Sequence, residues 1–172
     1  TNAATQLAGT VTEAGHLDDG TAVAGTATVS GTLSASDVDT GATQNWTLQG
    51  VPSTTYGTMA LNAGTGQWTY SLNNGLAATQ ARKDGQSGTR TCTGVDPGDR
   101  GANEEKTITA TINGTNDAAT VSSATVGLGE TNAALTGTGT LTSTDVDYPN
   151  TFTASSTTRS EERRVGKECS VT

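Results

Sequence analysis

The chain has 172 residues, with 17 acidic against 9 basic side chains and a formal net charge of −8. Because such a chain repels phosphate backbones and anionic lipid at neutral pH, its charge argues against a nucleic-acid partner. No apolar run approaches the roughly 18 to 20 residues of a membrane-spanning helix, and we expect no membrane insertion of this segment.

Alternating apolar residues predict short strands along the first two thirds of the chain. Trp68, Tyr70 and Leu72 recur with a period of two, which is the pattern of half-buried strands. Ile108, Ala110 and Ile112 recur in the same way. In chain order the expected strands are Thr10–Glu13, Thr26–Ala35, Asn45–Gln49, Gly57–Asn62, Gln67–Asn73, Thr89–Val95 and Thr107–Asn113. The expected turns are Asn62–Gly66, Asn73–Gly75 and Asp96–Gly101, and the expected helix is Leu76–Arg82. Leu, Ile, Val and Phe make up only 24 residues, which leaves disorder open as an alternative.

The number of strands indicates the fold class. Seven short strands within about 110 residues is typical of an immunoglobulin-like sandwich. We therefore expect an all-β fold, an immunoglobulin- or cadherin-like β-sandwich repeat.

One nine-residue motif occurs twice. GTLSASDVD, Gly31–Asp39, returns as GTLTSTDVD, Gly139–Asp147, 108 positions later. Repetition at domain length indicates a tandem array, here one complete module and a truncated second. The expected division is a preceding linker to residue 9, a complete repeat at 10–117, a truncated repeat at 118–158 and a tail at 159–172.

Several motifs together resemble the VCBS repeat, a domain found in tandem in very large bacterial surface and secreted proteins, including RTX-type adhesins. They are YGTMALNAGTGQWTYSLNN (Tyr56–Asn74), the GLAATQA that follows, the DVD motif before it and TITATINGTND (Thr107–Asp117). The resemblance implies an extracellular or bacterial cell-surface location, a role in adhesion or biofilm formation, and neighbouring repeats of the same chain as partners.

The sequence departs from this family in three places. The first copy carries about nine extra residues between Glu13 and its GTL motif, which we expect to form a loop. Arg90 and Cys92 stand where core residues are expected, so packing there is in doubt. The tail Arg159–Cys169, RSEERRVGKEC, is similar to a translated sequencing adapter and is expected to be non-native. A solvated charged tail and a basic recognition segment are the alternatives for it.

The Cys and His content argues against disulfides and zinc. Cys169 lies in the tail, which leaves Cys92 without a partner. His16 is the single histidine, and we expect it in a mobile loop. One loop histidine without a G-x-S-x-G motif offers no catalytic constellation, and we expect no enzymatic activity.

The repeated aspartates predict a calcium site, since two Asp at i and i+2 leaving a strand can point both carboxylates at one cation. The pattern is similar to that of cadherin-like modules, in which a Glu, a linker Asn-Asp and a DxD share calcium between domains. The similarity implies that the junction of the two repeats is formed by Glu13, Asn116, Asp117, Asp145 and Asp147. Asp37 and Asp39 would serve the preceding junction. Turn chemistry alone is the alternative, because Asp often caps local backbone amides.

The sequence therefore predicts a non-catalytic spacer, stiffened by calcium, in a tandem array. Two alternatives remain open. The module could bind surface or matrix glycans through Trp46, Trp68 and Tyr70, although their alternation favours core packing. It could also belong to the repeat region of a large secreted toxin or hydrolase.

Overall fold

The computed structural model describes residues 6–17, 19–35, 43–51, 53–98, 103–129 and 135–149. This part of the chain is mostly β structure in several small sheets. Its elements are β1 (Ala8–Thr12), β2 (Gly15–His16), β3 (Ala22–Val23), β4 (Thr28–Thr32), β5 (Thr47–Gln49), β6 (Gly57–Leu61), β7 (Gln67–Leu72), α1 (Ala77–Gln80), β8 (Ser87–Asp96), β9 (Glu104–Asn113), β10 (Thr120–Val121) and β11 (Ser143–Thr144). None of its helices has the length and apolar character that crossing a bilayer requires. Each strand expected from the sequence is present, and the expected helix is a single turn.

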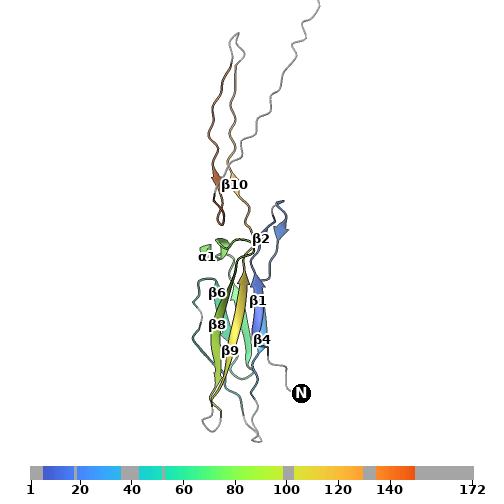
Figure 1. The fold of residues 1–172 in the computed structure, drawn as a ribbon, viewed down its shortest axis with the longest axis vertical. Helices are drawn as coiled ribbons and strands as arrows, with labels where there is room; N and C mark the ends of the chain where they lie inside the picture. Colours follow the sequence, from blue (N-terminus) through green and yellow to red (C-terminus); the bar gives the residue numbers. More distant parts are fainter. Residues whose placement is uncertain are drawn as a thin grey trace, which may run out of the picture.

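Two larger sheets contain most of the strands. The first has the order β1-β9-β8-β5, and the second has the order β4-β7-β6. All pairs in them are antiparallel except β1 and β9, which run parallel. β1 and β9 therefore end side by side, at the end of the sheets where α1 and β2 also lie (Figure 1). This arrangement places the residues that follow β1 next to those that follow β9.

The hydrophobic core draws side chains from both larger sheets. Its buried members are Val11, Leu33, Trp46, Trp68, Tyr70, Leu72, Cys92, Ile108, Ala110 and Ile112. Alternation explains the set, because every second residue of a strand faces the same side. The indole nitrogen of Trp68 donates a hydrogen bond to the carbonyl oxygen of Gln6 at 2.8 Å, which satisfies the one polar atom of that buried ring.

The packing of β8 resolves the doubt about its polar residues. Gly88, Arg90, Cys92 and Gly94 share one side of the strand, which is the more buried one. Cys92 is a member of the core, and burial raises the pKa of its thiol. Arg90 is only half-buried. The glycine at position 94 fits here because Leu33 reaches over from the end of β4 and would lie 2.3 Å from a Cβ at Gly94.

The extra residues of the first repeat do not form the expected loop. β2 and β3 pair as a two-stranded antiparallel sheet, with His16 opposite Ala22. A short turn connects them, in which the amide of Leu17 donates to the carbonyl of Thr21 at 2.9 Å and Gly20 has a φ of 84°. His16 accordingly lies in a strand and is half-buried, which corrects the prediction of a mobile loop. The Gly in the turn supplies the positive φ that other residues avoid.

The predicted turn at Asn62–Gly66 is confirmed. The Oδ1 atom of Asn62 accepts hydrogen bonds from the amides of Gly64 and Thr65, each at 3.1 Å. The turn at Asn73–Gly75 uses the same chemistry, with the amide of Gly75 donating to Asn73 Oδ1 at 2.9 Å. The third predicted turn lies partly outside the described residues. Asn is common at turns because its side chain can accept hydrogen bonds from backbone amides nearby in the sequence.

The described part of the expected second repeat forms a hairpin-like extension. β10 pairs antiparallel with β11, and this part projects away from the two larger sheets (Figure 1). Its large apolar side chains are about half exposed: Val121, Val126, Leu128, Leu135, Leu141 and Val146. Leu141 matches the core residue Leu33 in the repeated motif, yet it is 48% exposed where Leu33 is 1% exposed. The same motif therefore occupies two different environments.

Glycine in the repeated motif provides a test of this difference. A Cβ at Gly31 would lie 2.5 Å from the Gln6 carbonyl oxygen and 2.7 Å from the Trp68 ring, whereas a Cβ at Gly139 would meet nothing closer than 3.5 Å. We expect Gly31→Ala to lower the free energy of unfolding by about 1–3 kcal/mol through overpacking. Gly139→Ala should change it by less than about 0.5 kcal/mol, as surface substitutions do. Urea unfolding of both variants measures these changes in free energy. Equal losses of free energy in the two variants would contradict the difference in environment.

Candidate metal site at the junction of the repeats

The first predicted ligand, Glu13, lies at the end of β1. Its amide continues the parallel pairing by donating to the carbonyl of Asn113 at 3.0 Å, and the residue is fully buried. Its carboxylate is held from two sides. Gln80 Nε2 donates to Oε1 at 3.1 Å, and the amide of Thr115 donates to Oε2 at 3.3 Å. The Thr115 hydroxyl also donates to the Glu13 carbonyl at 2.8 Å. Glu13 thus connects β1 to α1 and to the segment after β9.

Burial and neighbouring charge raise the pKa of Glu13 to about 7. Burial is the largest cause, since a carboxylate removed from water favours its neutral form. Asp117 and Asp147 raise it further by repulsion, while the Thr115 amide and the Arg82 guanidinium oppose the rise. The carboxylates of Asp117 and Asp147 therefore lie near enough to Glu13 for their charges to act on it.

The DVD motif of the second repeat forms a turn next to these groups. Asp145 Oδ1 accepts hydrogen bonds from the amides of Asp147 at 3.1 Å and Tyr148 at 2.9 Å. A hydrogen bond with Asp147 is the main reason that the pKa of Asp145 is lowered. The turn chemistry that was the alternative interpretation is therefore present at Asp145.

Asp147 links this turn to the linker between the repeats. Its Oδ2 atom accepts a hydrogen bond from the amide of Asp117 at 3.2 Å. Asp147 is 6% exposed, and its burial, followed by its hydrogen bond with Asp145, raises its pKa. Burial also raises the pKa of Asp117, against the opposing charge of His16. Two buried oxygens here, Asp117 Oδ2 and Asp147 Oδ1, have no hydrogen-bond partner among the described residues.

A second contact joins the segment after α1 to the DVD turn at the same place. The ammonium group of Lys83 lies 4.8 Å from the centre of the Tyr148 ring. A cation over an aromatic ring contributes about 0.5–1 kcal/mol at an exposed site. Lys83 also lowers the pKa of Asp145. The junction, which we define as Glu13, Thr115–Asp117 and Asp145–Tyr148, is thus held by hydrogen bonds and by this cation.

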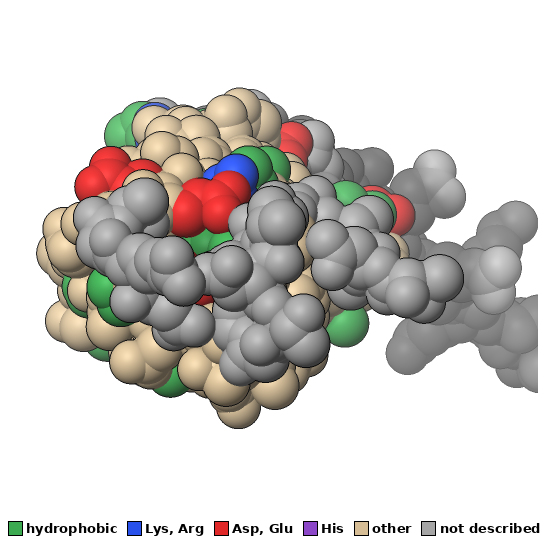
Figure 2. Space-filling view, turned by 90° about the horizontal axis from the view of Figure 1, so that it is seen from below, with side chains coloured by type: hydrophobic (Ala, Val, Ile, Leu, Met, Phe, Trp, Pro, Cys, Tyr) green, Lys and Arg blue, Asp and Glu red, His purple; other side chains and the backbone are tan. Residues whose placement is uncertain are grey.

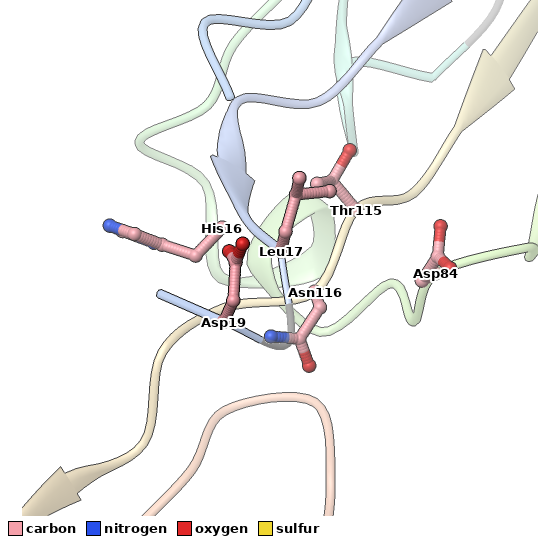
Figure 3. Close-up of a pocket in the computed structure, with 6 residues that line it drawn as sticks. All are labelled: His16, Leu17, Asp19, Asp84, Thr115 and Asn116. Carbon is pink, nitrogen blue, oxygen red and sulfur yellow. The ribbon is translucent and has the colours of Figure 1, made fainter. Parts of the chain in front are cut away.

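Asn116 has a different role from the other predicted ligands. Its carbonyl accepts a hydrogen bond from the amide of His16 at 2.6 Å, which attaches β2 to the linker. It lines a pocket of about 340 Å³ beside the junction, together with His16, Leu17, Asp19, Asp84 and Thr115 (Figure 3). In Figure 3 its side chain is directed away from Thr115, whose backbone amide binds Glu13. Asn116 therefore belongs to this pocket as well as to the linker.

The remaining predicted ligands, Asp37 and Asp39, lie outside the described residues. Within the described ranges, no three Asp, Glu, His or Cys side chains are grouped so that they could hold a metal ion. The oxygen donors at the junction are of the type that calcium prefers, but they do not form a closed coordination shell. The donor chemistry fits calcium, and the side chains of the junction would have to draw together to bind it.

Sequence reasoning missed the residues that hold Glu13. Thr115 is part of the GTND motif and could have been considered, because its neighbours Asn116 and Asp117 were. Nothing in the sequence indicated that Gln80 reaches Glu13, 67 positions earlier. Contacts of this kind depend on the arrangement of strands in space.

Comparisons with known proteins assign no family to the chain. No protein-family model matches the sequence, and no curated protein matches it. The resemblance to VCBS repeats therefore stays a prediction.

Proposed function

We propose that this chain is a non-catalytic spacer from a tandem array of VCBS-like repeats in a bacterial secreted or cell-surface protein. The two larger sheets would form one immunoglobulin- or cadherin-like β-sandwich module, and the β10–β11 segment would begin the next. The observation that carries the proposal is the meeting of the DVD turn of the second repeat with the buried Glu13 of the first. The amide of Asp117 donates a hydrogen bond to Asp147, and the charge of Asp147 acts on the carboxylate of Glu13.

The acidic junction suggests how the spacer would be stiffened. Without a cation, the charges of Asp117 and Asp147 add to the effect of burial on Glu13, and burial likewise raises the pKa values of Asp117 and Asp147. A calcium ion would replace the repulsion at Glu13 by attraction and satisfy the oxygens of Asp117 and Asp147 that lack partners. Because Glu13 and Asp117 belong to one repeat and Asp147 to the next, bound calcium would restrict their relative motion. A rigid array could hold an adhesive domain away from the cell during adhesion or biofilm formation.

Thermal unfolding in excess calcium and in chelator tests this proposal. A ligand that binds only the folded state stabilises it by RT ln(1 + [L]/Kd), about 2.7 kcal/mol at a concentration a hundred times Kd. We expect calcium to raise the melting temperature at pH 7.5 by several degrees. The substitution Asp147→Asn should remove most of the rise, because it takes away a charge at the junction.

The matched control is Glu105→Gln, which also removes one negative charge but at an exposed position in β9. This variant should keep the full response to calcium. An identical melting temperature in calcium and chelator for the unmodified chain would refute the calcium part of the proposal, and the aspartates would then serve as turn residues. If calcium raised the melting temperature equally in the unmodified chain, Asp147→Asn and Glu105→Gln, the cation would have to bind elsewhere.

The glycan-binding alternative loses the residues that suggested it. Trp46 is 1% exposed, and Trp68 and Tyr70 are fully buried. Rings inside the core cannot stack on a sugar. The toxin or hydrolase alternative concerns the protein beyond this chain, and the same spacer role would apply within it.

A further inference from the structure

The hairpin of β10 and β11 presents an apolar face that the proposed function does not use. A Cβ at Gly137 would lie 2.5 Å from Val126 and 3.2 Å from Leu128, and a Cβ at Gly139 would lie 3.8 Å from Val126. These residues therefore face the same side, and Leu141 follows Gly139 at the spacing of two that returns a strand to one side. We define the apolar face as Val126, Leu128, Gly137, Gly139 and Leu141. Its three large side chains are between 48% and 53% exposed.

The hairpin already contains one of the contacts of the first module. Allowing for the extra residues of the first repeat, Val126 corresponds to Gly9 in β1, and Gly137 corresponds to Val29 in β4. A Cβ at Gly9 would collide with the side chain of Val29, as a Cβ at Gly137 would with Val126. The contact between β1 and β4 thus recurs in the hairpin with the large and the small residue exchanged. The hairpin has the arrangement of the first two segments of a module.

The first module shows what covers this pair of segments. Gly31 of β4 lies opposite Trp68 of β7, and a Cβ at Gly31 would lie 2.7 Å from the Trp68 ring. The amide of Leu33 donates to the carbonyl of Gly66, immediately before β7, at 2.9 Å. β7 pairs in turn with β6 on its other side. The cover is therefore a two-stranded segment whose tryptophan lies over a glycine.

Among the described residues, nothing takes the place of β7 at the hairpin. Gly139 and Leu141 are the counterparts of Gly31 and Leu33, yet the nearest described atom to a Cβ at Gly139 belongs to Ala124 of the hairpin itself, at 3.5 Å. The sequence QWTYSL occurs once in the 172 residues, and it forms β7 of the first module. A second segment of this kind has to come from another chain.

Charge does not oppose such a segment. Between Ala118 and Thr144 the sequence has one charged residue, Glu130, and Tyr56–Asn74 has none. Charged side chains are seen instead on the end of the molecule opposite β10 and β11 (Figure 2). β10 and β11 form a sheet of two strands, so their outer edges have no strand partner in the described part of the chain. Charges on an edge strand normally prevent pairing with another strand, and this hairpin lacks them.

We propose that the apolar face binds a two-stranded segment like β6 and β7, supplied by another chain of the same repeat type. The added strand would form main-chain hydrogen bonds with the hairpin, and its alternate side chains would cover the apolar face. Its tryptophan would lie over Gly139 as Trp68 lies over Gly31. Two chains would thereby be joined through one completed module. This inference rests on the tandem-repeat part of the proposed function, because it treats the hairpin as the start of a module.

A synthetic peptide of Tyr56–Asn74, with two lysines at each end, tests the proposal by titration into the isotope-labelled full chain in chelator. We expect saturable shifts of the amide signals of Gly139 and Leu141 in nuclear magnetic resonance spectra, with that of Gly31 unchanged. The same peptide with Trp68→Ser should bind at least tenfold more weakly, because it lacks the ring that covers the glycine. No saturable shift, equal binding of the two peptides, or shifts centred on Gly31 would each overturn the proposal.

Two glycine variants of the full chain test where the peptide binds. Gly139→Ala places a Cβ where the tryptophan ring should lie, and it should weaken binding of the unmodified peptide at least tenfold. Gly127→Ala is the matched control, because a Cβ there meets nothing within 4 Å and lies on the opposite side of the strand from Val126. It should change the affinity less than twofold. Equal weakening in both variants would contradict the assigned position.

Two further outcomes separate this inference from its alternatives. If the signals of Gly139 and Leu141 depend on the concentration of the chain without peptide, a second copy of the hairpin covers the face, and the proposal is wrong. Because the titration is done in chelator, a failed calcium test leaves its expected result unchanged. Absence of peptide binding in a chain that still responds to calcium would refute this inference and leave the calcium-stiffened spacer standing.

Discussion

Replacing Leu33 by Ala is expected to lower the free energy of unfolding by about 2–5 kcal/mol, the range for removing a large aliphatic side chain from a core. Leu33 is 1% exposed and lies against Gly94 of the other sheet, so its loss would leave a cavity between the two sheets. Where the loss of free energy falls within this range depends on how far Trp46 can move into the cavity. Urea unfolding followed by tryptophan fluorescence measures the loss.

The repeat supplies the control for this prediction within the same chain. Leu141 occupies the matching position of the second motif but is 48% exposed, and Leu141→Ala should change the free energy by less than about 0.5 kcal/mol. If both substitutions cost the same, the second repeat must bury its leucine in solution. In that event the hairpin of β10 and β11 would pack on another surface, and the comparison of Gly31 with Gly139 should show equal losses as well.

The strands were predictable because alternation is a local signal. Trp68, Tyr70 and Leu72 reveal a strand without any knowledge of its partner, and the turn at Asn62 is equally local. The sequence did not indicate that β1 pairs parallel to β9, since pairing joins residues about a hundred positions apart. The strand pair within the insertion was missed for a related reason, because Gly15 and His16 are too few to show a period.

The residues that form the junction were predictable, but the burial of Glu13 was not. A resemblance placed Glu13, Asp117 and Asp147 together. In the structure the charges of Asp117 and Asp147 act on Glu13, and the amide of Asp117 donates to Asp147. Burial of Glu13 could not be foreseen, because it follows from the parallel pairing and from Gln80 reaching across from α1. For Arg90 the sequence suggested a packing problem that the structure does not have. A charged residue at a core position was expected to disturb packing, whereas its guanidinium lies over the ring of Tyr56 at the edge of the core.

The stability of the chain without calcium is expected to fall as the pH rises from about 4.5 to about 7. In that window Glu13 is ionised in the unfolded chain but still neutral in the folded one, because its folded-state pKa is raised to about 7. The folded state then binds more protons, and its advantage is lost as the pH rises through the folded-state pKa. A shift of this size corresponds to about 3 kcal/mol. Asp117 and Asp147, whose pKa values are also raised, contribute in the same direction.

The variant Glu13→Gln should flatten most of this dependence. Its amide oxygen can accept from the Thr115 amide, and Gln80 can turn its own amide to face the new NH₂ group, so no buried polar atom need lose a partner. Thermal unfolding in chelator, repeated across this pH range, measures the stability of the unmodified chain and of Glu13→Gln. Parallel curves for the two would show that Glu13 is not the group responsible.

Calcium should reverse the sign of the pH dependence in the unmodified chain. Metal ligands must be deprotonated, so binding strengthens as the carboxylates of the junction ionise. The raised pKa of Glu13 then becomes the switch: below it the proton neutralises the buried carboxylate, and above it calcium does. Glu13→Gln should therefore be the more stable protein in chelator at pH 7.5 and gain less from calcium than the unmodified chain. A larger gain for the variant would mean that Glu13 opposes metal binding, and the junction would have to bind calcium through the aspartates alone.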